Sequence, residues 1–280
     1  MKNTSILRSS LAFGLMATAS LHAGIIAWDD FESSTLGALS GQSGGDGWTA
    51  AWVADSTTQV VSKSMNYSAG EISISGGSQA VFGSDPSTGS FSASRLFDEV
   101  TGGGTVYMSL LFERVGDLSG DVLDFNLGDN PANYRPSAGV DVQGVYNNSM
   151  YAAGGGTIIR TSTGVSVTSS TDLLVVRLSS GAEGYTTLDV LINPTTITEP
   201  ATGWTTTNIT LGEEEYMMDS LNAFLIRNVN LDPGDGFYMD NLIISDSYSD
   251  VVNPIPEPSG IAWFGGLGAL AFVITRRRRL

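Results

Sequence analysis

The sequence contains no cysteine and a single histidine, His22. Without cysteine the chain forms neither disulfide bonds nor thiol-based catalytic sites. His22 lies in an N-terminal segment that we expect to be removed, so the mature protein would have no histidine either. Ser-His-Asp and Cys-His catalysis are therefore excluded, and so are ordinary zinc sites.

Basic residues are also scarce: 13 lysines and arginines stand against 29 aspartates and glutamates. Seven of those 13 basic residues and 28 of the 29 acidic ones fall in residues 24–253, which gives this segment a net charge of −21. Such a charge repels nucleic acid and anionic lipid. It suits solubility outside the cell, and it would also suit calcium or a cationic partner.

Residues 1–23 have the organisation of a secretory signal peptide, with Lys2 and Arg8 before an apolar stretch at 11–19. Cleavage after Ala23 or after Ala19 fits the small residues there. An uncleaved anchor is the alternative, but the apolar stretch is too short to span a bilayer. We therefore expect export, with signal peptidase and the secretion machinery as partners.

The C-terminal end combines a proline-rich lead, an apolar run and four arginines. Prolines 254, 256 and 258 hold the backbone extended. Residues 259–275 carry no charge, and as a helix they would span about 26 Å, just short of a bilayer core of about 30 Å. The cytoplasmic stop that follows consists of Arg276, Arg277, Arg278 and Arg279.

This order of parts resembles the PEP-CTERM protein-sorting signal of Gram-negative bacteria, over residues 254–280. The resemblance implies that an exosortase, a membrane transpeptidase, recognises Pro256, Glu257 and Pro258 and cleaves nearby. It implies an inner-membrane-anchored precursor whose body then reaches the cell surface or the extracellular space. A plain C-terminal membrane anchor is the alternative.

The body between these ends predicts an all-β fold, an antiparallel β-sandwich or jelly roll. Residues 71–75 and 121–127 alternate apolar and polar side chains, as half-buried strands do. Residues 172–178 and 186–193 flank a glycine-containing turn and predict an antiparallel hairpin. We expect four parts: signal peptide 1–23, β-sandwich 24–250, proline-rich linker 251–258, and transmembrane helix with cytoplasmic tail 259–280.

Three short motifs resemble concanavalin/laminin-G-like jelly rolls: residues 28–32, residues 41–48 with Trp52, and residues 237–244. The resemblance implies a lectin-like fold without by itself implying sugar binding.

Two kinds of binding site are candidates on this body. Aromatic side chains in loop-like segments are typical of glycan binding, with core packing as the alternative, and the candidates are Trp48, Trp52, Tyr134, Tyr146 and Tyr151. Clustered aspartates suggest Ca²⁺, with turn formation as the alternative, and these are Asp117, Asp121 and Asp129. The aspartates do not match the EF-hand loop pattern.

Laminarinase relatives of this fold carry Glu-x-Asp-x-x-Glu on one strand, and this chain lacks that pattern. We therefore predict a non-enzymatic cell-surface or extracellular-matrix protein that contacts extracellular polysaccharide. Two alternatives stay open: a secreted carbohydrate-active enzyme of unrecognised type, and a passive structural exoprotein.

Overall fold

A computed structural model describes residues 24–84, 93–118, 120–129, 136–152, 158–181, 184–208, 218–229 and 231–253. The predicted signal peptide lies outside these residues. So do the sorting triplet Pro256, Glu257 and Pro258, the arginine block and the predicted transmembrane helix. Among the residues that are described, no helix combines the length and apolar character that crossing a membrane requires.

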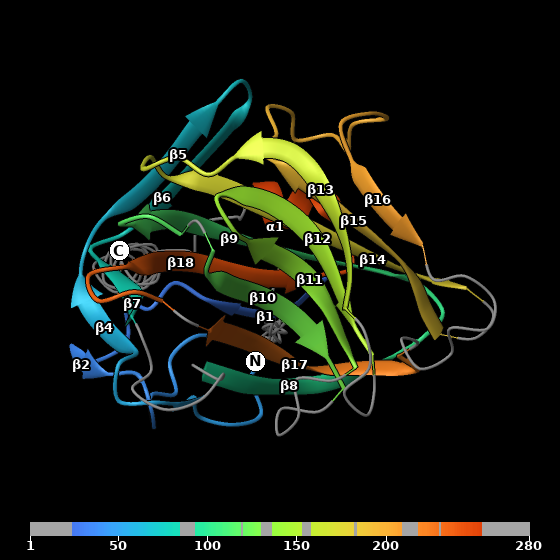
Figure 1. Cartoon of the computed structure of the whole chain (residues 1–280). Helices are drawn as coiled ribbons and strands as arrows, with labels where there is room; N and C mark the ends of the chain where they lie inside the picture. Colours follow the sequence, from blue (N-terminus) through green and yellow to red (C-terminus); the bar gives the residue numbers. More distant parts are fainter. Residues whose placement is uncertain are drawn as a thin grey trace, which may run out of the picture.

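Strands of the described residues form two large antiparallel sheets (Figure 1). The nine-stranded sheet has, in spatial order, β16 (Thr205–Asn208), β15 (Gly184–Ile192), β14 (Asp172–Gly181), β9 (Thr105–Val115), β18 (Gly236–Ser245), β7 (Gln79–Ser84), β4 (Gln59–Ser62) and β2 (Gly37–Ala38). Strand β1 (Ile25–Asp29) also pairs with β18.

The seven-stranded sheet has the spatial order β13 (Ile158–Ser166), β12 (Val145–Tyr151), β11 (Ser137–Val142), β10 (Val122–Gly128), β17 (Ser220–Val229), β8 (Ala93–Thr101) and β3 (Val53–Ala54). The expected all-β antiparallel sandwich is confirmed. The expected hairpin is confirmed too, because β14 and β15 pair antiparallel from Leu174↔Ile192 to Gly181↔Gly184.

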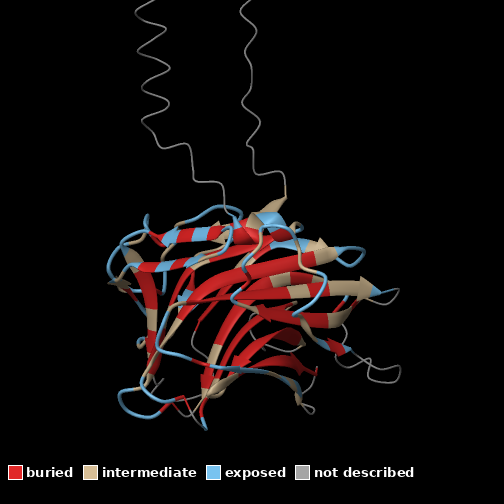
Figure 2. Ribbon diagram, turned by 90° about the horizontal axis from the view of Figure 1, so that it is seen from above, coloured by how far each residue is buried: buried red, intermediate tan, exposed pale blue. Residues whose placement is uncertain are grey.

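The main core lies between the two sheets, where Figure 2 shows the strands mostly buried. Its centre is aromatic: Phe112 of β9 meets Phe125 of β10 edge-on, with ring centroids 5.7 Å apart, and Phe125 meets Phe237 of β18 at 5.6 Å. Such edge-to-face pairs add about 0.5–1.5 kcal/mol beyond the area they bury. They fix the two sheets face to face.

A second core lies on the outer face of the nine-stranded sheet. It is covered by the hairpin β5 (Met65–Ala69) and β6 (Ile72–Gly76) and by the short helix α1 (Tyr248–Val252). The hairpin alternates strictly, so Ile72 and Ile74 face the sheet while the residues between them face solvent. This sheet therefore has an apolar layer on both sides.

The two ends of the described body meet at one edge of the nine-stranded sheet. The carbonyl oxygen of Gly24 accepts hydrogen bonds from the Ser245 hydroxyl, at 2.8 Å, and from the Asp246 backbone N–H, at 3.0 Å. Helix α1 follows directly after this contact, and its Val251 and Val252 are buried. The first and last elements of the body thus hold one another.

Candidate functional site

The glycan-binding candidates among the described residues do not share an exposed face. Trp52 is 1% exposed and belongs to the main core, and Trp48 is half-buried with its ring centroid 6.0 Å from that of Trp52. Tyr146 is also in the core, and its hydroxyl donates to Asp172 Oδ2 at 2.5 Å. The sequence pattern did not predict this burial, because it does not show that the indole and hydroxyl groups find buried hydrogen-bond partners. Tyr134 lies outside the described residues.

A buried ion pair accounts for the position of the two tryptophans. Arg95 Nη1 lies 2.5 Å from Asp29 Oδ2, and Trp52 Nε1 donates to the same oxygen at 3.1 Å. The Arg95 guanidinium also lies 4.8 Å from the ring centroid of Trp48. The pair joins β1 of one sheet to β8 of the other. The charges of Asp29 and Arg95 compensate one another, so we interpret this ion pair as a structural feature.

The three calcium candidates are not brought together. Asp121 precedes β10 and Asp129 follows it, so a seven-residue strand separates them by roughly 25 Å. Asp117 is exposed, and its backbone N–H donates to Asp235 Oδ1 at 3.0 Å. In the described part of the chain, no group of three or more acidic or histidine side chains is arranged to hold a metal ion.

Polar side chains gather instead on the outer face of the seven-stranded sheet. Leu123, Phe125 and Leu127 of β10 point into the core, so the side chains that alternate with them, Asp124 and Asn126, point outward. The strand register brings residues from four strands alongside them: Arg227 on β17, Asp141 on β11, Ser149 and Tyr151 on β12, and Arg160 on β13. We call this set, with Asp124 and Asn126, the outer-face cluster.

Asp124 is the centre of the cluster and is fully buried. Its Oδ2 accepts a hydrogen bond from the Tyr151 hydroxyl at 2.5 Å and pairs with Arg227 Nη1 at 3.0 Å. Arg227 also donates to the Tyr151 oxygen at 3.2 Å. Tyr151 was a glycan-binding candidate, and it is the one member of that set within this cluster.

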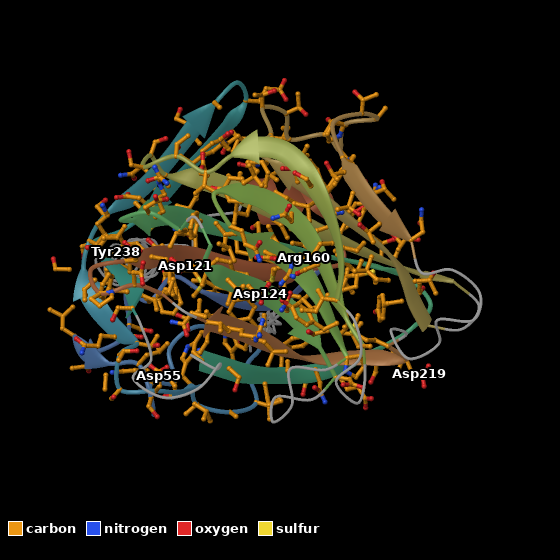
Figure 3. All side chains as sticks on the ribbon, in the orientation of Figure 1. Asp55, Asp121, Asp124, Arg160, Asp219 and Tyr238 are labelled. Carbon is orange, nitrogen blue, oxygen red and sulfur yellow. The ribbon has the colours of Figure 1, made fainter. Side chains whose placement is uncertain are left out.

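Asp141 is paired with Asp124 across neighbouring strands and is equally buried. Its Oδ2 accepts from Arg160 Nε and, at 3.1 Å, from Gln143 Nε2. Within the described residues its Oδ1 has no hydrogen-bond partner. Figure 3 shows Asp124 and Arg160 next to each other over the middle of this sheet. The two acids are thus equally buried but unequally hydrogen-bonded.

Burial and proximity change the proton affinity of these groups. Burial, together with the charge of Asp124, raises the pKa of Asp141 to about 7, against the opposing charge of Arg160. Burial also raises the pKa of Asp124, while hydrogen bonding from Tyr151 and the charge of Arg227 oppose the shift. Burial and the neighbouring Asp124 raise the pKa of Tyr151, so its phenol stays protonated. A pKa of about 7 allows Asp141 to exchange a proton near neutral pH.

Solvent reaches the cluster most easily at Arg160, whose side chain is 32% exposed, compared with 11% for Arg227 and none for either aspartate. Sequence reasoning missed the cluster because its members come from five strands. One signal was present: Asp124 and Asn126 interrupt the apolar strand 122–128 at a spacing of two. A pattern confined to one strand cannot detect carboxylates supplied by two neighbouring ones.

The fold is similar to that of several solved structures. The endo-β-1,4-glucuronan lyase of the fungus Trichoderma reesei is 10% identical, with 78% of this chain and 97% of that chain covered and a TM-score of 0.45. A β-1,3-glucanase from Mycobacterium marinum is 11% identical, with 79% and 98% covered and a TM-score of 0.45. The Emp47p carbohydrate recognition domain is 9% identical, with 76% and 94% covered and a TM-score of 0.43.

At these identities the likeness concerns the fold alone. No protein-family model and no curated protein matches the sequence.

The prediction of a non-enzymatic protein is corrected here. Structures of similar fold include glucanases, glycosyl hydrolases and polysaccharide lyases, so the fold gives no ground for excluding an enzyme. The prediction had rested on the missing Glu-x-Asp-x-x-Glu pattern. Asp124 and Asp141 show that paired carboxylates occur here without it, from strands β10 and β11.

Proposed function

We propose that this chain is a secreted carbohydrate-active enzyme that hydrolyses an extracellular polysaccharide at the outer-face cluster. One observation carries the proposal: Asp124 and Asp141 are paired on adjacent strands, both fully buried, with different hydrogen-bond environments. Glycoside hydrolysis requires two carboxyl groups of unequal proton affinity. The cluster supplies such a pair.

Asp141 is the general acid of this proposal. Its pKa of about 7 keeps much of it protonated near neutral pH, and its unpartnered Oδ1 can hold the proton that passes to the leaving glycosidic oxygen. Cleavage leaves positive charge at the anomeric carbon, and addition of water there returns a proton to Asp141.

Asp124 supplies the negative charge that stabilises this positive charge. Donors from Tyr151 and Arg227 favour its ionised form, and the charge of Asp124 in turn raises the pKa of Asp141. The phenol of Tyr151 is held protonated, so it acts as a hydrogen-bond donor rather than as a base.

Substitution of the two aspartates tests the proposal. We expect Asp141→Asn and Asp124→Asn each to lower the release of reducing ends from a polysaccharide panel by about 10²- to 10⁴-fold. The matched control is Asp189→Asn. Asp189 is also buried and lies 2.8 Å from an arginine, Arg177, but belongs to the nine-stranded sheet. A wild-type body that cleaves no polysaccharide of the panel, or an Asp141→Asn variant with full activity, overturns the proposal.

The pH dependence of the same reaction gives a second test. Because the acid must be protonated, we expect kcat/KM to fall as pH rises above about 7, the pKa of Asp141. The measurement is a rate profile from pH 5 to pH 9 on a neutral polysaccharide. A rate that stays constant across the upper half of this range contradicts the role of Asp141.

We further propose that the body is exported and released from an inner-membrane precursor by an exosortase that reads Pro256, Glu257 and Pro258. The signal-like residues 1–23 and the order of parts in 254–280 support this. Replacing the triplet with alanines should leave the body attached to the inner membrane in cell fractionation. Unchanged release from that variant contradicts dependence on the triplet.

A further inference from the structure

Asn126 is a fully buried amide with no hydrogen bond from its side chain. Neither its Oδ1 nor its Nδ2 has a partner within the described part of the chain. Leaving a buried polar group unpaired costs about 1–3 kcal/mol. Buried polar groups are usually satisfied, so an amide with both ends unpaired requires an explanation.

The position of Asn126 places it beside the two acids. It lies two residues after Asp124 on the same face of β10, and its register partners are Leu225 on β17 and Gly139 on β11. Leu225 offers it no polar group. Gly139 leaves the space that the amide occupies: a β-carbon there would lie 2.6 Å from Asn126 Oδ1 and 2.0 Å from the Phe125 carbonyl oxygen.

Beyond Gly139 the next residue in register is Ser149. Its hydroxyl lies 3.5 Å from Asp124 Oδ1, at the limit of a hydrogen bond. Asn126 is therefore bordered by an apolar side chain, a glycine and a weakly engaged hydroxyl. These neighbours leave both ends of its amide without a hydrogen bond.

We propose that Asn126 binds two neighbouring hydroxyl groups of the sugar ring that is held at Asp141. The amide presents one acceptor and two donors in a plane, so one sugar hydroxyl donates to Oδ1 while the next accepts from Nδ2. This inference rests on the proposed function and narrows its substrate class. The substrate is a polysaccharide with unsubstituted adjacent hydroxyls on the bound ring.

The test replaces Asn126 with an apolar side chain of similar size. Asn126→Leu removes the unpaired amide, so we expect the variant to resist urea at least as well as the wild type. In the same variant we expect KM for the cleaved polysaccharide to rise about 10- to 100-fold, the effect of losing two hydrogen bonds. A matched control is Asn66→Leu on hairpin β5–β6, beyond the nine-stranded sheet, for which we expect an unchanged KM.

Substrate modification supplies the second measurement. The wild type should bind an oligosaccharide of the cleaved polysaccharide about 10- to 100-fold more tightly than its O-methylated counterpart, and Asn126→Leu should lose this preference. Calorimetric titrations in an Asp141→Asn background measure binding without turnover.

The outcomes separate the two claims. The role of Asn126 is overturned if the Asp141→Asn protein binds the two ligands with equal affinity, both with and without the Asn126→Leu substitution. Binding that depends on Asn126 without any cleavage by the wild type overturns the enzymatic proposal alone.

Discussion

Single side chains that are charged and buried hold the sandwich together. Asp29 and Arg95 are at most 3% exposed, and they link β1 of the nine-stranded sheet to β8 of the seven-stranded sheet. Two tryptophans pack around them, and the Arg95 Nε donates to the Ala50 carbonyl at 2.9 Å. A pair of this kind is costly to break because the remaining partner stays buried without compensation.

We therefore expect Arg95→Ala to lower the free energy of unfolding by about 3–5 kcal/mol. The comparison is Arg114→Ala, which breaks an ion pair of 3.9 Å to the exposed Asp117 and should cost less than about 1 kcal/mol. Urea denaturation measures both. Similar losses for the two variants would show that burial of the Asp29–Arg95 pair has no special effect.

Asp240 is a buried acid of a different kind. Burial, together with the charges of Asp30, Glu32 and Asp29, raises its pKa to about 9, while the hydrogen bond from the backbone N–H of Asn241 opposes the shift. Its folded pKa thus lies above the unfolded value of about 4. At pH values between these two pKa values, the folded state keeps the proton that the unfolded state releases. The free energy of unfolding therefore falls as pH rises, with a slope of up to about 1.4 kcal/mol per pH unit.

An asparagine at this position mimics the protonated acid. We expect Asp240→Asn to match the wild type below about pH 4 and to become increasingly more stable than it as the pH rises to about 9. Thermal unfolding across this range measures the difference, and Asp98→Asn at an exposed site is the control. A difference that does not change with pH contradicts the raised pKa.

At the scale of elements, the hairpin β5–β6 closes the outer face of the nine-stranded sheet. Ile72 and Ile74 face the sheet, whereas Ser73 between them is exposed. We expect Ile72→Ala to lower the free energy of unfolding by about 2–5 kcal/mol, since it leaves a cavity, and Ser73→Ala to change it by less than about 0.5 kcal/mol. Equal effects in guanidinium titrations would mean that the hairpin does not seal this core.

Local pattern was sufficient to predict this hairpin strand and the pair β14–β15, because both depend on alternation and a nearby turn. It was insufficient for β17 and β18, which are close in sequence but lie in opposite sheets. The candidate site likewise has one part that local pattern predicts and another that depends on strand pairing between distant parts of the sequence. The alternation of residues 122–127 separates Asp124 from Phe125, but only the pairing of β10 with β17, about 100 residues later in sequence, brings Arg227 to Asp124.

At the scale of the whole molecule, closure of the sandwich depends on the contact between the two ends of the described body. Gly24 has φ +135°, and a β-carbon there would lie 2.6 Å from Asp250 Oδ2 and 2.9 Å from Asp246 Oδ1. We expect Gly24→Ala to weaken this contact by roughly 1–3 kcal/mol and to speed amide exchange in α1. Hydrogen-exchange mass spectrometry would detect the change, with Gly37→Ala at an open position as the control. Unchanged protection of α1 would show that the ends are held independently.

The meeting of the two ends also has a mechanical consequence. Strand β1 begins opposite the end of β18, with Ile25 paired to Ser245, and the two run antiparallel. A force that draws the two termini apart would act on this pair at its first hydrogen bond and peel β1 away one bond at a time, instead of loading all of its bonds together. The β1–β18 pair next to Gly24 is therefore where the sandwich would open under tension.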